Sequence, residues 1–216
     1  VLYGFDGFIT SNERSANIGN IEYLGLEINH QWSKSREYEL LTQEYLKEFI
    51  SPTLQYMSLL RPLSEYSIIE QFVKFPKYFH IFSSCNRNFS LTHIAEQKWC
   101  GTCPKCAFVF ALLGAHISRE ELLSIFGGNL FDTEALVKTY RELLGLEGMK
   151  PFECVGTPDE VRLAFSEMHE KGEFEDTRMM KIFLSEVLPH SDFDEIRKSV
   201  THVDEGILPS KFSTIL

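Results

Sequence analysis

Apolar residues recur at helical spacing through most of the second half of the chain, which predicts a helical region beyond about residue 116. Ser118-Arg-Glu-Glu121 and Thr157-Pro-Asp-Glu160 both have the Ser/Thr-x-x-Glu form of a capping box, so each predicts a helix start. Gly172 is expected to end the second of these helices. Three more helices are predicted: one capped by Asp132 and closed by Gly145, one over 176–187, and one over 191–200.

The first half of the chain mixes strand-like and helix-like patterns, which favours an α/β fold. Val1–Ser11 has the length and aromatic content of a buried strand, and Tyr78–Ser83 those of a short strand that leads to Cys85. One helix is predicted to begin at Glu37 and to end before Pro52, and a second to follow the candidate N-cap Ser64. A third is predicted to have Pro104 in its first turn.

Two polar clusters follow the first predicted strand. The first covers residues 11–20, and ligands of open α/β sheets bind at the carboxyl ends of strands, where such a loop would lie. The second covers residues 29–36 and combines cations, an aromatic ring and hydroxyls, as a phosphate or carboxylate site would. Solvated turns would have the same composition, so both interpretations stay open at this stage.

Four of the five cysteines fall within 22 residues, at positions 85, 100, 103 and 106. Two Cys-x-x-Cys turns place thiolates close together, and four thiolates complete a tetrahedral zinc site with no open position for a substrate. We therefore favour a structural zinc held by Cys85, Cys100, Cys103 and Cys106, which would hold a loop and do no chemistry. An iron–sulfur cluster and disulfides remain alternatives.

The fifth thiol, Cys154, lies in the compact segment Lys150-Pro-Phe-Glu-Cys-Val-Gly156, beside a carboxylate. A free cysteine in such a place usually behaves as a small apolar residue. A catalytic role is the alternative.

Composition narrows the classes of partner. The formal charge of −10 disfavours a nucleic-acid surface, which needs a local excess of Lys and Arg, so a small molecule or a protein is the expected partner. The longest apolar run, Cys106 to Ala115, is about half of the roughly 20 residues that a membrane helix needs. We expect a soluble cytoplasmic protein with reduced thiols and no membrane partner.

Six segments, in this order, resemble the MurL family of UDP-N-acetylmuramoyl-L-alanyl-L-glutamate epimerases. The resemblance spans roughly residues 4 to 160. The segments are Ser11–Asn17, Asn29–Ser35, Leu60–Glu65, Ser84–Asn86, Trp99–Phe108 and Lys150–Gly156.

The MurL family is in turn similar to pyrophosphate-loop ATP-dependent synthetases, which implies an adenine-nucleotide α-hydrolase-like parallel sheet. The implied layout is a C-terminal part of that α/β domain over 1–82, a four-cysteine metal loop with its following helix over 83–116, and a helical C-terminal region over 117–216. A Ser-Gly-Gly-x-Asp-Ser phosphate loop, which the resemblance also implies, is missing from these residues, so we expect an upstream segment to carry it.

The resemblance implies inversion of the terminal L-glutamate of a peptidoglycan precursor through an acyl-adenylate, with ATP as co-substrate, magnesium and a structural zinc. For this reaction we expect Asn12, Arg14, Ser15, Ser33, Lys34 and Arg61 to bind the substrate or the nucleotide. The sequence does not identify the base, for which His30, Glu13 and Cys154 are the candidates. Two alternatives remain: a related synthetase of modified nucleobases, and a zinc-stapled interaction module without catalysis.

Overall fold

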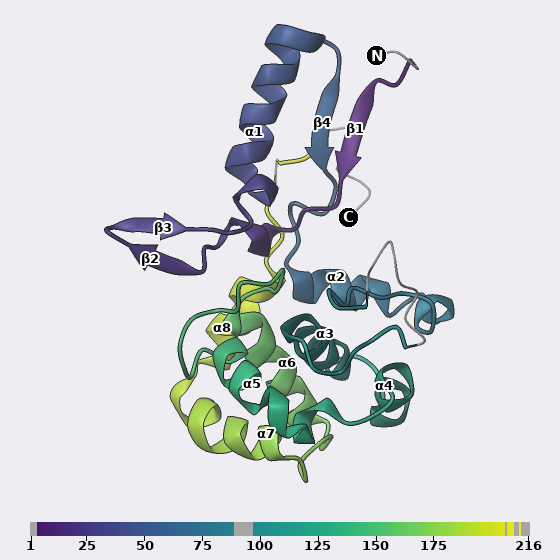
Figure 1. Ribbon diagram of the computed structural model, residues 1–216, viewed down its shortest axis with the longest axis vertical. Helices are drawn as coiled ribbons and strands as arrows, with labels where there is room; N and C mark the ends of the chain where they lie inside the picture. The colour runs from purple at the N-terminus through teal and green to yellow at the C-terminus, as the bar shows by residue number, and fades with distance from the viewer. Residues whose placement is uncertain (1–3, 89–96, 206, 210–211, 213–216) are drawn as a thin grey trace. The chain divides into compact units, whose positions relative to one another are not determined.

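The computed structural model describes residues 4–88, 97–205, 207–209 and 212 (Figure 1). By packing, these residues form two compact units: the described parts of 1–65 and 201–216 make one, and the described parts of 66–200 make the other. The strands are β1 (Gly7–Thr10), β2 (Ile21–Tyr23), β3 (Leu26–Ile28) and β4 (Gln55–Ser58). The helices are α1 (Arg36–Tyr45), α2 (Glu65–Phe72), α3 (Pro104–Gly114), α4 (Arg119–Phe126), α5 (Val137–Leu143), α6 (Pro158–Glu170), α7 (Arg178–Ile182) and α8 (Phe193–Thr201).

The first unit contains a small parallel sheet. β1 pairs with β4 in register Gly7 to Gln55 through Thr10 to Ser58, and α1 lies between these two strands in the chain. This arrangement confirms a mixed α/β fold with a parallel sheet, although among the described residues that sheet has two strands. β1 was expected to be buried, but the side chains of Phe8 and Ile9 are 60% and 50% exposed.

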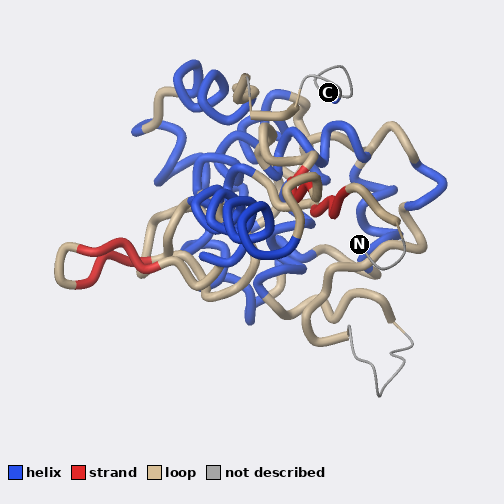
Figure 2. The backbone as a smooth tube through the Cα atoms, turned by 90° about the horizontal axis from the view of Figure 1, so that it is seen from above, coloured by secondary structure: helices blue, strands red, loops and turns tan. Residues whose placement is uncertain are grey.

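The first unit also has an antiparallel hairpin that the sequence analysis did not anticipate, drawn in red in Figure 2. β2 and β3 are joined by Leu24 and Gly25, both at positive φ, which is the geometry of a type I′ turn. Glycine adopts this backbone conformation without strain, so Gly25 is the local signal that predicts the hairpin.

The second unit is helical and has a large apolar core. α3 is buried along its whole length and packs against α4, α5 and α6. Aromatic rings fill the space among these helices: Phe131 contacts Phe110, Phe165 and Phe174 at centroid distances of 4.8 to 5.1 Å. The helical C-terminal region is therefore confirmed.

The structure shows why several helices begin where the sequence predicted them to. Thr157 and Glu160 form the complete capping box of α6, Ser118 caps α4, and Pro104 occupies the first turn of α3. The predicted helix ends at Gly145 and Gly172 are also confirmed, since both residues adopt positive φ just after a helix.

Two predicted elements were wrong. Residues 78–83 form no strand, because Phe79 and Phe82 pack their rings on Phe72 of α2 and stay close to a helix rather than pairing with a strand. Asp132 does not cap a helix. Thr133 precedes the 3₁₀ turn Glu134–Leu136 that leads into α5, and the Asp132 carboxylate accepts hydrogen bonds from Asn129 and the Arg178 amide.

The expected boundaries at residues 82 and 116 stay a prediction about domains. In packing terms, the cysteine loop and the helices after it share one core.

Candidate metal centre and polar loops

The four clustered cysteines converge on one point. Their sulfur atoms all lie within 4.8 Å of one another, and no disulfide joins any of them. The Sγ atoms of Cys85 and Cys103 are 3.9 Å apart, those of Cys100 and Cys106 3.7 Å, and those of Cys103 and Cys106 3.4 Å. Zinc–sulfur bonds of ~2.3 Å in a tetrahedron require sulfur–sulfur distances of about 3.8 Å, so the residues fit this metal.

Local backbone geometry brings the cysteines together. Gly101 adopts φ +67° in the turn between Cys100 and Cys103, and Cys103 is the N-cap of α3. The Cys103 sulfur accepts a hydrogen bond from the Cys106 amide at 3.4 Å, and the Cys85 sulfur accepts one from the Cys100 amide at 3.4 Å. Backbone amides thus favour the thiolate form at two of the sulfurs, as metal ligands require.

Crowding also shifts the acidity of the thiols. The pKa of Cys103 is lowered to about 4, chiefly by its hydrogen bond with the Cys106 thiol, and the same contact raises the pKa of Cys106. Burial raises the pKa of Cys85. Four thiols this close cannot all ionise without a cation, so a divalent metal would resolve their mutual repulsion.

The segment Lys150–Gly156 is attached to this cysteine loop. Asn86, next to Cys85, donates a hydrogen bond to the Glu153 carboxylate, and Lys105 donates one to the Cys154 carbonyl. A metal at the cysteines would therefore hold this segment as well as its own loop. Cys154 itself is half-buried in the second unit.

Gly156, which ends that segment, is closely packed against a buried carboxylate. Glu160 is 1% exposed and accepts hydrogen bonds from the Thr157 amide at 2.5 Å and the Tyr66 amide at 3.2 Å. It thereby links the first turns of α6 and α2.

Replacing Gly156 with alanine is expected to lower the free energy of unfolding by about 1–3 kcal/mol. The added Cβ would overlap the Glu160 carboxylate and lie 2.9 Å from Cζ of Phe108, so the buried cap must move. Urea unfolding of the variant measures the change. Gly128→Ala is the matched control, because no described atom lies within 4 Å of its added Cβ. Equal stabilities for the two variants would contradict the expectation.

Polar residues gather where β1 and β4 end. The Ser58 hydroxyl, on the last residue of β4, donates to the Asn12 carbonyl at 2.6 Å. The Asn12 amide donates to the Thr10 hydroxyl at 3.4 Å, and the Arg14 amide donates to the Leu63 carbonyl at 2.8 Å. The loop after β1 is thus fixed to the segment after β4, at the edge of the sheet where α/β proteins bind ligands.

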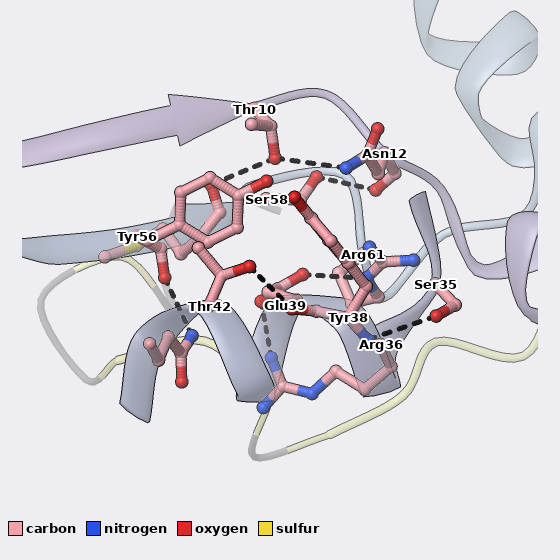
Figure 3. Close-up of polar contacts among 12 residues, drawn as sticks. Thr10, Asn12, Ser35, Arg36, Tyr38, Glu39, Thr42, Tyr56, Ser58 and Arg61 are labelled. Carbon is pink, nitrogen blue, oxygen red and sulfur yellow. Dashed lines mark hydrogen bonds and ion pairs between the residues drawn. The ribbon is translucent and has the colours of Figure 1, made fainter. Parts of the chain in front are cut away.

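Arg61 lies at the centre of this arrangement and has no exposed surface (Figure 3). Its Nε donates to the Glu39 carboxylate at 3.0 Å, its Nη1 to the Glu13 carbonyl at 2.8 Å, and its Nη2 to the Lys34 carbonyl at 2.6 Å. The sequence interpretation makes Arg61 a ligand of anionic groups, whereas in the structure each of its three nitrogens contacts the protein.

The other predicted site residues of the loop after β1 differ in how deeply they are buried. Arg14 donates to the His202 carbonyl at 2.5 Å and lies 3.7 Å from the Asp204 carboxylate. Ser15 is buried, and its hydroxyl accepts a hydrogen bond from the Glu65 amide at 3.4 Å. Asn12 and Glu13 are half-buried.

The second polar cluster contributes His30, Ser33 and Lys34 to the same unit. His30 is exposed, and its Nδ1 lies 2.5 Å from the Asn20 amide oxygen. Because that oxygen accepts, the neutral ring carries its proton on Nδ1, which leaves Nε2 as the basic nitrogen. Ser33 and Lys34 lie in the short turn Trp32–Lys34 before α1.

Sequence reasoning missed Glu39, the buried carboxylate that pairs with Arg61. A glutamate in the first turns of a helix is normally solvated, and its partner lies 22 residues further along the chain. Ser58 was also missed. Neither residue belongs to a motif with a fixed spacing.

The profile of the MurL C-terminal domain matches residues 81–197, which include the four cysteines, and that of the MurL N-terminal domain matches residues 1–59. The chain belongs to the MurL family.

Curated MurL relatives support the match over most of the chain. A protein of Xanthomonas oryzae pv. oryzae is 39% identical over 95% of this chain, and one of Micromonospora sp. is 42% identical over 87%. Both are named UDP-N-acetyl-alpha-D-muramoyl-L-alanyl-L-glutamate epimerase, as is a Salinispora tropica protein at 42% identity. The chain spans less than half the length of these relatives, at 46%, 42% and 41%.

No solved structure matches the chain significantly. Among the described residues, no helix combines the length and the apolar character needed to cross a membrane.

Proposed function

We propose that this chain is part of a cytoplasmic ATP-dependent epimerase that inverts the terminal L-glutamate of UDP-N-acetylmuramoyl-L-alanyl-L-glutamate. The observation that carries the proposal is the match over 95% of the chain to a relative of that name. The polar loops 11–17 and 31–35 support it, because Arg61 hydrogen-bonds to both and they carry carboxylate, guanidinium, ammonium and hydroxyl groups.

The reaction has a clear electrostatic difficulty. Removing the α-proton of a glutamate whose carboxylate is ionised would place a second negative charge beside the first. Attack of that carboxylate on the α-phosphorus of ATP, with release of pyrophosphate, would convert it to an acyl-adenylate and remove the charge. The enolate formed by loss of the α-proton is then open to stabilisation by nearby hydrogen-bond donors.

Proton transfer requires a base on one face of the enolate and return of a proton on the other face. Water then cleaves the acyl-adenylate to AMP and the D-glutamate carboxylate. His30, Glu13 and Cys154 stay candidates for the base.

The anionic substrates would be bound by the polar loops. We assign Asn12, Arg14 and Ser15 to the nucleotide or substrate, and Ser33 and Lys34 to phosphate or carboxylate groups. Magnesium would accompany ATP. The four cysteines would hold a structural zinc that stabilises the second unit and supplies no chemistry to the reaction, because all four ligand positions are taken by sulfur.

The test is release of AMP from ATP by the complete protein that contains this chain, with and without UDP-N-acetylmuramoyl-L-alanyl-L-glutamate. The expected result is AMP that depends on this substrate, together with D-glutamate in the acid hydrolysate. The same assay with modified-nucleobase precursors separates the related synthetases. No AMP from metal-replete protein with any of these substrates would overturn the proposal and favour an interaction module.

A further inference from the structure

Glu39 and Arg61 form a buried ion pair at the base of the two polar loops. The Glu39 residue is 1% exposed and Arg61 is fully buried, and their Oε2 and Nε atoms are 3.0 Å apart. The other Glu39 oxygen lies 2.5 Å from Nη1 of Arg36. Figure 3 shows the carboxylate on α1 lying between the two guanidinium groups.

Stability alone gives a weak reason for such a pair. Taking two charges out of water costs free energy, and the attraction between the charges often does no more than offset that cost. A protein with a well-packed apolar pair in the same place is often as stable as one with the ion pair. A buried pair of this kind is better explained by the geometry that it imposes on its surroundings.

Arg61 fixes the positions of two backbone carbonyls by hydrogen bonds. One belongs to Glu13, in the loop after β1, and the other to Lys34, in the turn before α1. Both loops carry side chains that the proposed function assigns to substrates. The planar guanidinium donates in three directions at once, so one side chain fixes both loops relative to the end of β4.

We propose that Arg61 and Glu39 are positioning residues for the epimerase reaction, holding the loops 11–17 and 31–35 in register without contacting substrate. Glu39 orients the guanidinium and balances its charge, and Arg61 passes that orientation to the two carbonyls. The expected effect on kinetics rests on the proposed function, whereas the geometry comes from the structure itself.

The first measurement is hydrogen–deuterium exchange of the substrate-free complete protein, wild type against Arg61→Lys. Lysine keeps the charge but cannot reach three acceptors. The amides of Arg14, Lys34 and Ser35 are hydrogen-bonded in the structure and so report on the loops. Their exchange is expected to rise about tenfold or more, because charge-assisted hydrogen bonds to both carbonyls weaken. Exchange in α3 is expected to stay unchanged.

The second measurement is steady-state kinetics of the same variant and of Glu39→Gln. Displacement of both loops is expected to lower kcat/KM about tenfold or more for ATP and for the muramoyl substrate together. A direct substrate ligand would instead raise the KM of one substrate and leave loop exchange unchanged. Arg141→Lys is the matched control: this arginine pairs with Glu186 on the surface of the second unit, and its replacement should alter neither readout.

The two proposals fail in different ways. Raised loop exchange in Arg61→Lys, together with no epimerase activity in the wild-type protein, would refute the function and keep the positioning geometry. Unchanged loop exchange in Arg61→Lys would overturn the positioning role whatever the activity. Loss of protection in α3 as well would also overturn it, since the pair would then be required for folding.

Discussion

Replacing Cys103 with serine is expected to release the bound metal and unfold most of the second unit. Cys103 is both a predicted ligand and the N-cap of α3, the helix at the centre of that core. Structural zinc contributes roughly 10–16 kcal/mol in small metal domains. That is as large as the whole stability of a typical domain, about 5–15 kcal/mol.

Metal content and thermal unfolding by circular dichroism measure this effect. The expected results are one zinc per wild-type chain, less in the variant, and a broad or absent unfolding transition. Treating the wild type with a strong chelator should have the same outcome. Cys154→Ser makes the same chemical change outside the cluster and should keep both the metal and the transition. A Cys103→Ser protein with full zinc content and an unchanged midpoint would refute the assignment of this ligand.

Replacing Phe131 with alanine is expected to cost about 3–5 kcal/mol of unfolding free energy. The ring is fully buried among Phe110, Phe165 and Phe174, in a core made of close ring contacts that cannot collapse into the space left behind. Urea denaturation followed by circular dichroism measures the loss.

Phe75→Ala is the control for this experiment. It removes the same atoms from a side chain that is 53% exposed, so its effect should be a small fraction of the Phe131 effect. Similar losses at the two positions would show that the aromatic cluster is not the main source of stability.

Features that depend on local chemistry could be predicted from the sequence. The starts of α4 and α6 depend on Ser118 and Thr157, whose cap partners lie three residues further along the chain, and Pro104 suits the first turn of α3 by its own fixed φ. The cysteine cluster is predictable for the same reason, since three of its four ligands are set by two short turns.

Features that depend on distant pairing could not be predicted. Parallel pairing of β1 with β4 joins residues 48 positions apart, and no local pattern specifies it. Phe79 and Phe82 have the composition of a strand, but their conformation is decided by Phe72 on another element. Tertiary context outweighs propensity at such positions.

The candidate site divides in the same way. The polar character of the loops could be predicted from composition, whereas the contacts of Arg61 could not, because they come from three separate segments. From the sequence alone, a buried arginine and an arginine that binds substrate look the same.

The way Arg61 contacts its neighbours has a consequence for how the two loops can change in sequence. Two of its three contacts are to main-chain oxygens, at Glu13 and Lys34, which every amino acid possesses. The side chains at these two positions can therefore be exchanged without removing the acceptors that Arg61 needs. Mutational libraries at positions 13 and 34, with Glu39 and Arg61 kept, would vary the side chains of both loops while leaving these two acceptors in place.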